Sequence, residues 1–407
     1  MHVWGKLPTN PRRNRGKNAT EADTKDRGLH PARISPDGAI SSWWIVTGVS
    51  FCLLMIGIGN IRTAFGDEVY YVDAAHAVLQ GAPATIRDHH PPLGKSLIAV
   101  SIATLGDNPL GWRFPSVLAG TLLAVAVFGV TRKLTADRRT AYVAWLLTIG
   151  GGFWYALSRL AMLSIFELAF EMAAIWMFLT AVESEGIAWW CAAGVLFGLS
   201  VASRWLGAMG LLVCIAVAVR KRRMCKSCVM AMAALATYVA AWIPLLIREH
   251  RPLRYLIDIN IFIFRFHHEP AGGWDTGEPW WTWLLRTQQT RSFSPFLANP
   301  IIAALGLVAL AVICARPAKR RFALPALLYI AHLLPWVLGI RPVTYYYYYF
   351  EAYTFLGIAL AVVVANAALH KVRLDVIVTT AALGYFVYWY PTWAYLPPPY
   401  AGVFGYH

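Results

Sequence analysis

Charged residues are scarce in this chain of 407 residues, where they make up 14% of the sequence. Hydrophobic residues make up 58%. A soluble chain of this length would hold two or three domains, but it would not carry repeated apolar runs of about 18 or more residues. We therefore expect an all-α integral membrane protein.

Acidic residues and cysteines are also few. There are 21 acidic against 36 basic residues, which gives a net charge of +15. The basic residues fall in short clusters between apolar runs, as cytoplasmic loops require, so we expect no nucleic-acid partner. The six cysteines lie mostly inside apolar runs and indicate no disulfide framework. Cys225 and Cys228 form a single CxxC pair, which lacks two of the four ligands of a structural zinc site.

Two further features are missing from the sequence. No internal repeat is evident, which argues against a transporter built from duplicated halves. The first forty residues contain no apolar core segment, so they do not resemble a cleavable signal peptide. We expect residues 1–42 to form a basic, disordered cytoplasmic tail that touches anionic lipid.

Eleven apolar segments predict a transmembrane domain over 43–395. The positive-inside rule then places the N-terminus in the cytoplasm and the tail 396–407 outside. The expected spans are 43–59, 114–130, a third ending near 157, a fourth opening at 158, two that share 187–219, then 228–247, 295–315, 322–340, a tenth that begins with the tyrosines 345–349, and 376–395. The segment 248–294 is expected to be a long polar outer loop.

The most polar stretch of the chain lies between two strongly apolar segments. It reads GDEVYYVDAAHAVLQG, then RDHHPPLGKSL, then NPLGWRFPS, and it forms a first outer loop over 60–113. Ionisable groups at the edge of a bilayer are costly and point to function. Glycosyl transfer from a phosphate donor needs a carboxylate to take the acceptor proton and a cation to hold the leaving phosphate. The alternative is an ordinary polar loop with acidic residues at a helix start.

Local patterns predict two short helices in this first outer loop. Val69, Val72 and Leu79 recur at helical spacing, which favours a helix along the membrane interface. Pro91 and Pro92 interrupt it. The run LGKSLIAVSIATL then predicts a second interfacial helix that is too short to span a bilayer.

Three basic residues on the outer side are candidate phosphate ligands. Lys95, Arg113 and Arg341 each border a break that contains proline or glycine. Arg159 and Arg204 instead lie at span ends, where long basic side chains commonly extend towards the headgroups.

Several motifs follow one another in a familiar order. They are FGDEVYY, HHPPLGKSLIA, NPLGWRFPSVLAGTL, LSRLAMLSIFELAF, ASRWLGA and LPWVLGIRPVTYYYYYF. From about residue 43 to the C-terminus the chain resembles the polyprenol- or dolichyl-phosphate-mannose protein O-mannosyltransferases, membrane enzymes of the GT-C fold. The motif PWWTW at 279–283 resembles a Pro-Trp loop motif of the same family.

The resemblance implies an inverting transfer of mannose from a polyprenyl-phosphate donor to serine or threonine hydroxyls of exported proteins. On this chain the catalytic aspartate would be Asp67, with Glu68 beside it. Arg113 would lie near the donor phosphate, and His90 and Lys95 would line the site. Glu167, Trp281, Tyr345 and Arg341 complete the residues that we expect to support donor or substrate.

One position departs from the family pattern. The fourth span of the family usually begins R-x-AMLD, whereas this chain has Ser164 in place of the aspartate. Glu167 lies one turn later on nearly the same helix face and is the expected substitute. The loop 248–294 is too short for the large lumenal domain of the eukaryotic members. We therefore expect a compact bacterial member in the cytoplasmic (inner) membrane, with an extracytoplasmic active site.

Two other functions stay open. The same fold transfers other sugars from polyprenyl phosphate to lipid or glycan acceptors; the aminoarabinose transferases of lipid A are an example, but their EKPP element is absent here. A transporter or an inactive lipid-binding relative is the second alternative. No pattern indicates a cofactor or a clear metal site, so we expect neither. His267, His268 and Glu269 could form a metal site, but we expect them to be a polar loop element near the acceptor groove.

Overall fold

All regular structure in the part of the chain described here is helical. The computed structural model describes residues 36–81, 89–184, 186–269, 278–284, 298–316, 322–367 and 373–394. Residues 1–40 form a unit separate from 41–407, and the account below concerns the second unit. The expected tails 1–42 and 396–407 therefore lie wholly or mostly outside the described residues.

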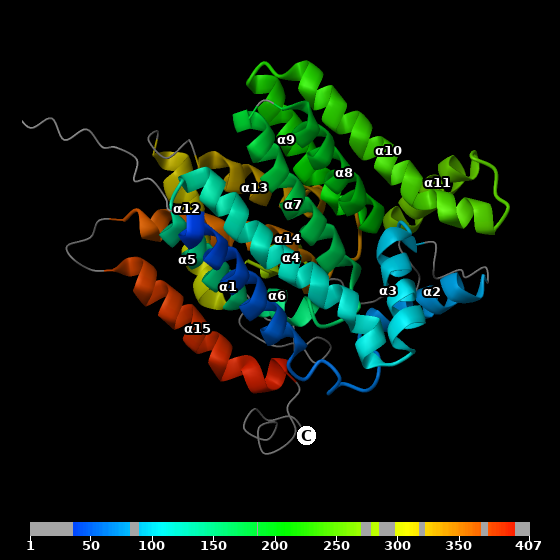
Figure 1. The fold of residues 1–407 in the computed structure, drawn as a ribbon, viewed down its shortest axis with the longest axis horizontal. Coiled ribbons are helices and arrows are strands. Elements are labelled where there is room, and N and C mark those ends of the chain that lie inside the picture. Colours follow the sequence, from blue (N-terminus) through cyan, green and yellow to red (C-terminus); the bar gives the residue numbers. More distant parts are fainter. Residues whose placement is uncertain are drawn as a thin grey trace, which may run out of the picture. The chain divides into compact units, whose positions relative to one another are not determined.

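The regular secondary structure of the described residues consists of fifteen α-helices and three short 3-10 helices (Figure 1). Their bounds are α1 Pro36–Met55, α2 Glu68–Gln80, α3 Leu93–Leu105, α4 Pro109–Thr135, α5 Arg138–Ile149, α6 Gly152–Leu157, α7 Leu163–Ser184, α8 Ile187–Ser203, η2 Trp205–Gly207, α9 Ala208–Arg220, α10 Met224–Arg248, α11 Tyr255–His268, η3 Trp280–Thr282, α12 Pro300–Ala315, α13 Ala323–Val337, η5 Tyr346–Tyr349, α14 Phe350–Ala365 and α15 Leu374–Trp393.

The helices have the character of an integral membrane protein. Four segments are long and apolar enough to cross a bilayer, namely α4, α7, α10 and the run Tyr346–Ala365. Six shorter apolar helices accompany them in the described residues. The expected all-helical membrane fold is confirmed, whereas the count of eleven spans stays a prediction.

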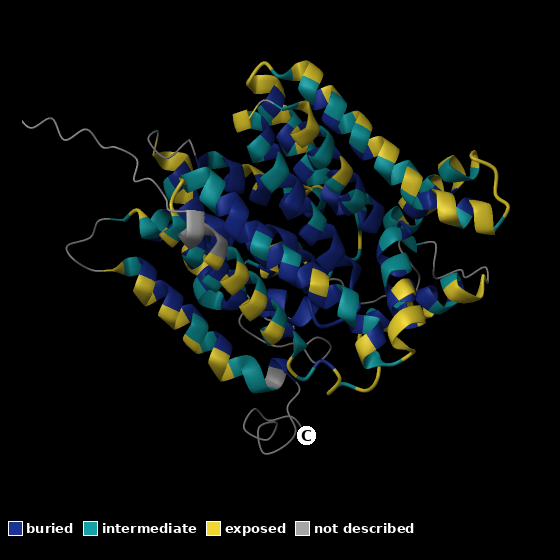
Figure 2. Ribbon diagram, in the orientation of Figure 1, coloured by how far each residue is buried: buried dark blue, intermediate teal, exposed yellow. Residues whose placement is uncertain are grey.

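The core lies around α7 and α14, which are buried along almost their whole length (Figure 2). Helix α7 packs against α4 and α8, while α14 packs against α12, α13 and α5. Helices α10 and α15 instead expose large apolar side chains such as Leu235, Ile247 and Val387. Exposed apolar surface of this kind is what a lipid-facing helix requires.

The first outer loop folds into the two expected helices, α2 and α3, which pack against each other. Gly81 ends α2 with φ of +69°, a left-handed conformation that favours glycine. Pro92 precedes α3, and Asn108 caps α4 by accepting hydrogen bonds from the N–H groups of Leu110 and Gly111. Helix α4 thus begins several residues before the span that the sequence predicts at 114.

Two spans differ from their expected form. The third is interrupted at Gly150 and Gly151, so that it consists of α5 and the short helix α6. The aromatic ring of Tyr353 occupies the place where a side chain at Gly151 would lie, with a nearest approach of 3.2 Å. The expected pair of spans over 187–219 does break at Arg204, between α8 and η2.

The segment 248–294 was expected to be a loop, but its described part contains the 14-residue helix α11. Its apolar residues Ile259 and Ile263 pack into a small cluster with Trp242 of α10. The helix carries four charged or histidine residues near its ends, which concealed its amphipathic pattern. Helix α11 matters for function because its C-terminal end reaches the site described next.

Candidate functional site

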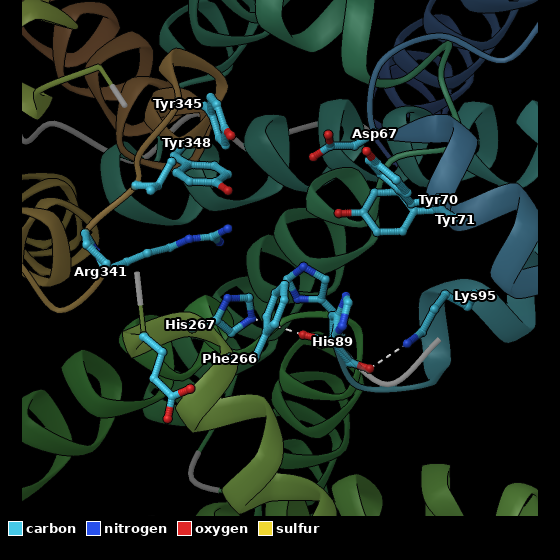
Figure 3. A pocket seen from close by; sticks show the side chains of 14 residues that line it. Asp67, Tyr70, Tyr71, His89, Lys95, Phe266, His267, Arg341, Tyr345 and Tyr348 are labelled. Atoms are coloured by element: carbon cyan, nitrogen blue, oxygen red, sulfur yellow. Dashed lines mark hydrogen bonds between the residues drawn. The ribbon is translucent and has the colours of Figure 1, made fainter. Parts of the chain in front are cut away.

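A cavity of about 310 Å³ opens where the first outer loop, α11 and the tyrosine-rich turn meet (Figure 3). Five chain segments supply its walls: the start of α2, the start of α3, the end of α11, the loop after α13, and η5. The lining residues are Asp67, Tyr70, Tyr71, His89, His90, Lys95, Phe266, His267, Glu269, Arg341, Pro342, Val343, Tyr345 and Tyr348. The cavity therefore unites five of the nine site residues that the sequence predicts: Asp67, His90, Lys95, Arg341 and Tyr345.

Asp67 is the carboxylate of the first outer loop that faces the cavity. Its Oδ2 accepts a hydrogen bond from the hydroxyl of Tyr347 on η5. Burial raises the pKa of Asp67 above its ordinary value, while the Tyr347 hydrogen bond and the charges of Arg341 and Arg204 oppose that rise. A raised pKa makes a carboxylate a stronger base, which suits Asp67 to take a proton.

Glu68, the next residue, points away from the cavity and is 0% exposed. It forms a two-point ion pair with Arg113, with Nε–Oε1 at 2.8 Å and Nη2–Oε2 at 2.7 Å. The same carboxylate accepts hydrogen bonds from the backbone N–H groups of Phe65 at 3.0 Å and Ala161 at 2.8 Å. Glu68 therefore fixes the loop that carries Asp67, because it joins that loop to α4 and to the turn before α7.

Arg113, which the resemblance places near the donor phosphate, is the partner of Glu68. Its side chain is also 0% exposed, and the cavity does not include it. Besides the two bonds to Glu68, it donates to the carbonyl oxygens of Ile58, Ile61 and Thr63 at 3.3, 2.6 and 2.9 Å. These five bonds use all five N–H donors of a guanidinium. The geometry therefore favours a positioning role for Arg113, while its expected role as a phosphate ligand stays a prediction.

Lys95, His89 and His267 lie in the lower half of the view in Figure 3, and His90 lines the same cavity. Lys95 is 2% exposed, and its Nζ donates to the carbonyl oxygen of His90 at 2.6 Å. The ring of His90 lies 4.9 Å from that of His267, whose Nε2 contacts the carbonyl oxygen of His89 at 3.0 Å. Burial lowers the pKa of both rings. For His90 the neighbouring His267 and the charge of Arg204 add to this effect. For His267 burial together with the charges of Arg341 and Arg204 gives a pKa of about 3.

Arg341 enters the cavity from the wall opposite Asp67 (Figure 3). Its guanidinium lies over the ring of Tyr348, 5.1 Å from the ring centre, and Arg204 lies 5.0 Å from the same ring. Among the described residues, Arg204 pairs with two carboxylates, whereas Arg341 forms no ion pair. A cationic wall beside neutral histidines is suited to an anion such as phosphate.

A second cavity of about 220 Å³ adjoins the first. The two share His90, His267 and Arg341 as lining residues. The remaining walls of the second cavity are largely apolar and include Trp205, Leu206, Met209, Ile263, Phe264, Pro335, Trp336 and Ile340. The site thus offers a polar chamber and an apolar chamber that meet at Arg341.

Two predicted support residues lie elsewhere. Glu167 is buried on α7, where its Oε2 lies 3.4 Å from Arg204 rather than in the cavity. Trp281, on η3, is 62% exposed and does not line either cavity. Ser164 is likewise buried on α7, and neither Ser164 nor Glu167 lines either cavity, so the expected substitution of Glu167 for the family aspartate stays a prediction.

Several residues of the site were not identified from the sequence. Tyr347 contacts Asp67, Tyr71 and Tyr348 line the cavity, and His267 faces His90. The run of five tyrosines was the available signal, because hydroxyl-bearing residues in an apolar context commonly have partners. His267 and His268 were noted as a polar loop element, but only His267 faces the first cavity; His268 contacts the carbonyl oxygen of Phe264.

The fold is shared with two solved membrane-protein structures. The protein O-mannosyltransferase Pmt1-Pmt2 complex of S. cerevisiae bound to the sugar donor superimposes with a TM-score of 0.73 at 11% identity, over 88% of this chain and 90% of that one. ArnT from Cupriavidus metallidurans bound to undecaprenyl phosphate gives a TM-score of 0.63 at 15% identity, over 90% of this chain and 67% of that one. The expected GT-C-type fold is thereby confirmed.

The family resemblance is confirmed over the middle of the chain. Residues 89–247 match the dolichyl-phosphate-mannose-protein mannosyltransferase family. Two curated relatives are polyprenol-phosphate-mannose–protein mannosyltransferases. That of Mycolicibacterium smegmatis is 29% identical over 46% of this chain and 45% of its own length. That of Mycobacterium tuberculosis is 31% identical over 40% and 38%. The matched region therefore covers less than half of each relative.

Proposed function

We propose that this chain transfers mannose from a polyprenyl-phosphate donor to serine or threonine hydroxyls of proteins. The observation that carries the proposal is the first cavity, in which the carboxylate of Asp67 faces the guanidinium of Arg341. The names of the curated relatives support both the donor and the protein acceptor. We assign no cofactor to the reaction.

The proposed reaction is a single displacement at the anomeric carbon of the sugar. The acceptor oxygen forms a bond to that carbon while the bond from the carbon to the phosphate oxygen breaks on the opposite face, which inverts the configuration. Asp67 takes the proton of the acceptor hydroxyl, and the polyprenyl phosphate leaves with the bonding electron pair. A positioned base of this kind contributes about 10²- to 10⁴-fold to the rate.

The leaving phosphate lies, in this proposal, between Arg341 and the start of α3. Arg341 supplies a planar cation for the phosphate oxygens, and Lys95 adds a second positive charge at the opposite wall. The apolar second cavity then accommodates the first part of the polyprenyl chain, since it meets the polar cavity at Arg341. Glu68 and Arg113 hold Asp67 in place without touching substrate.

We further propose that the protein resides in a bacterial cytoplasmic membrane with this site on the extracytoplasmic face and the N-terminus in the cytoplasm. The apolar helices and the distribution of basic residues support this orientation. A donor that is embedded in lipid can then meet an exported polypeptide at headgroup depth.

The test is transfer of labelled mannose by the purified full chain. Polyprenyl-phosphate-mannose in detergent should be consumed, and the label should appear on a peptide that contains serine and threonine but not on its alanine counterpart. Parallel reactions with a lipid acceptor and with a glycan acceptor distinguish the other members of the fold. Transfer only to lipid or glycan would overturn the protein-acceptor proposal, and no transfer to any acceptor would overturn the assignment as a transferase.

A further inference from the structure

A second cluster of ionisable side chains is buried between α7, α13 and α14 (labelled in Figure 1). Of its members, Arg204 alone lines one of the two cavities. Glu167 and Glu171 come from α7, His332 from α13 and Glu351 from α14, and Arg204 joins them from the break after α8. All four carboxylate and imidazole side chains are fully buried. Burial of so many charges is expensive unless each group is paired.

The carboxylates of this cluster outnumber the cations. Arg204 pairs with Glu351 and lies 3.4 Å from Glu167, but a single guanidinium does not neutralise three carboxylates. Two oxygens, Glu167 Oε1 and Glu351 Oε2, have no hydrogen-bond partner among the described residues. Glu171 Oε1 lies 3.1 Å from His332 Nε2. Unpaired buried oxygens in one cluster indicate that a positively charged group belongs among them.

The imidazole of His332 is oriented as a metal ligand would be. Its Nδ1 lies 2.8 Å from the carbonyl oxygen of Leu328, which can only accept, so Nδ1 carries the hydrogen. The carboxylate of Glu171, 3.1 Å from Nε2, also only accepts, so without a metal a hydrogen lies between the two groups, and a divalent ion would replace that hydrogen on the Nε2 lone pair. A histidine that donates one N–H to a backbone carbonyl and offers its other nitrogen to a cation is the usual arrangement at metal sites.

We propose that Glu167, Glu171 and His332 bind a divalent transition-metal ion such as Zn²⁺ or Mn²⁺. One ligand atom from each residue lies within 4.8 Å of the other two, so a small closure of the side chains brings all three to the usual distance of about 2.0–2.2 Å from one ion. One imidazole nitrogen with carboxylate oxygens suits zinc or manganese. A doubly charged ion and Arg204 together balance the three carboxylates.

The ion would have a structural role: it would hold in place the residues next to the first cavity. It would join α7 to α13, and Glu167 would continue the link to Arg204, which lies under the ring of Tyr348 in the first cavity. Helix α9 closes the cluster from another side: a Cβ at Gly210 would approach Glu171 Oε1 to 2.0 Å. No ligand is required from the reacting groups, so the proposal is independent of the proposed function.

The experiment measures metal content in the full-length protein, purified without an affinity tag and without chelators. We expect a stoichiometric amount of zinc or manganese by mass spectrometry in the unmodified protein. After removal of that metal, titration with Co²⁺ should give saturable visible absorption bands. Glu171→Gln and His332→Gln should each lose the bound metal and the cobalt spectrum, because the first replaces a carboxylate by a neutral amide of the same shape and the second removes the imidazole nitrogen.

His76→Gln is the matched control, since His76 on α2 pairs with Asp107 outside the cluster. It should keep both the metal and the cobalt spectrum. If the ligand variants do not fold, the unmodified protein still decides the question by its own metal content and cobalt titration. Absence of stoichiometric metal together with no saturable cobalt spectrum would overturn the proposal, and would mean that a proton shared among the carboxylates balances the cluster. Equal metal content in the two ligand variants and the control would overturn it too.

Discussion

Tyr347 donates a hydrogen bond to the carboxylate of Asp67, although 280 residues separate the two in the chain. The contact joins η5, at the start of α14, to the residue that precedes α2. It brings the tyrosine-rich turn and the first outer loop together at one cavity. The charge state of Asp67 therefore depends on a residue from the other end of the sequence.

Removal of this hydroxyl should change the pH at which Asp67 ionises. The hydrogen bond favours the charged carboxylate and so opposes the rise in pKa that burial causes. In Tyr347→Phe the pKa of Asp67 should rise further. As the pH is lowered, the decrease in kcat/KM should therefore begin at a higher pH than in the unmodified protein. The shift should be readily measurable, because a hydrogen bond to a charged group contributes about 1.5–3 kcal/mol.

Tyr349→Phe is the matched control for this pH profile. Tyr349 belongs to the same turn, but its hydroxyl faces that of Tyr329 at 3.1 Å and not Asp67. In this variant kcat/KM should decrease at low pH as it does in the unmodified protein. If kcat/KM decreases at the same low pH in both variants and in the unmodified protein, Tyr347 does not control the ionisation of Asp67.

The buried pair of Glu68 and Arg113 should matter for stability more than for donor affinity. Breaking a buried ion pair on one side costs about 3–5 kcal/mol, because the other charge is left without a partner. Glu68→Gln and Arg113→Lys should therefore lower the thermal midpoint in detergent, whereas Arg62→Lys on the exposed part of the same loop should not. If Arg113→Lys keeps its midpoint but raises the KM for the lipid donor, Arg113 binds phosphate after all.

Arg341 should account for donor binding. Arg341→Ala removes the cation that forms no ion pair among the described residues, and the KM for polyprenyl-phosphate-mannose should rise about 10- to 100-fold. Arg341→Lys should restore only part of this, since an ammonium lacks the planar fork. The control is Arg220→Ala, at the exposed end of α9. Unchanged donor KM in Arg341→Ala would place the phosphate elsewhere.

The proposed orientation can be tested by labelling. Asp73 on α2 and Lys221 after α9 are both exposed, and they should lie on opposite sides of the membrane. In a background without the native cysteines, a single cysteine at 73 should react with an impermeant reagent from outside, whereas one at 221 should react only after the membrane is opened. Labelling of both from the same side would contradict the proposed orientation.

The sequence predicted those parts of the site that local motifs encode. Asp67, His90 and Lys95 lie in short motifs of the first outer loop, and all three line the cavity. The sequence could not predict which of the two carboxylates faces the cavity, because Asp67 and Glu68 are adjacent and chemically alike. Only the packing of α4 against the loop shows that Glu68 turns inward to Arg113 while Asp67 faces the cavity.

Contacts between distant segments explain the other differences. The phosphate role expected for Arg113 followed from its motif, and only the fold shows that three backbone carbonyl groups and Glu68 accept hydrogen bonds from its guanidinium. Helix α11 was read as a loop because charged residues at its ends weakened its apolar pattern. The pairing of Tyr347 with Asp67 depends on tertiary packing, which no local pattern in the sequence records.

The central claim of this account is that Asp67 acts as the general base. Asp67→Asn keeps the shape of the side chain and removes its basicity, so it should lower the rate of transfer about 10²- to 10⁴-fold. Binding of the lipid donor and the thermal midpoint should stay close to those of the unmodified protein, because the carboxylate does not hold the fold together.

The most direct measurement compares the initial rate of mannose transfer by Asp67→Asn with that of the unmodified protein on one serine- and threonine-containing peptide. Both rates should be taken at saturating polyprenyl-phosphate-mannose, so that donor affinity does not enter the comparison. The account predicts that turnover is almost abolished while donor binding persists. Near-normal turnover in Asp67→Asn would show that Asp67 is structural and would contradict the proposed mechanism.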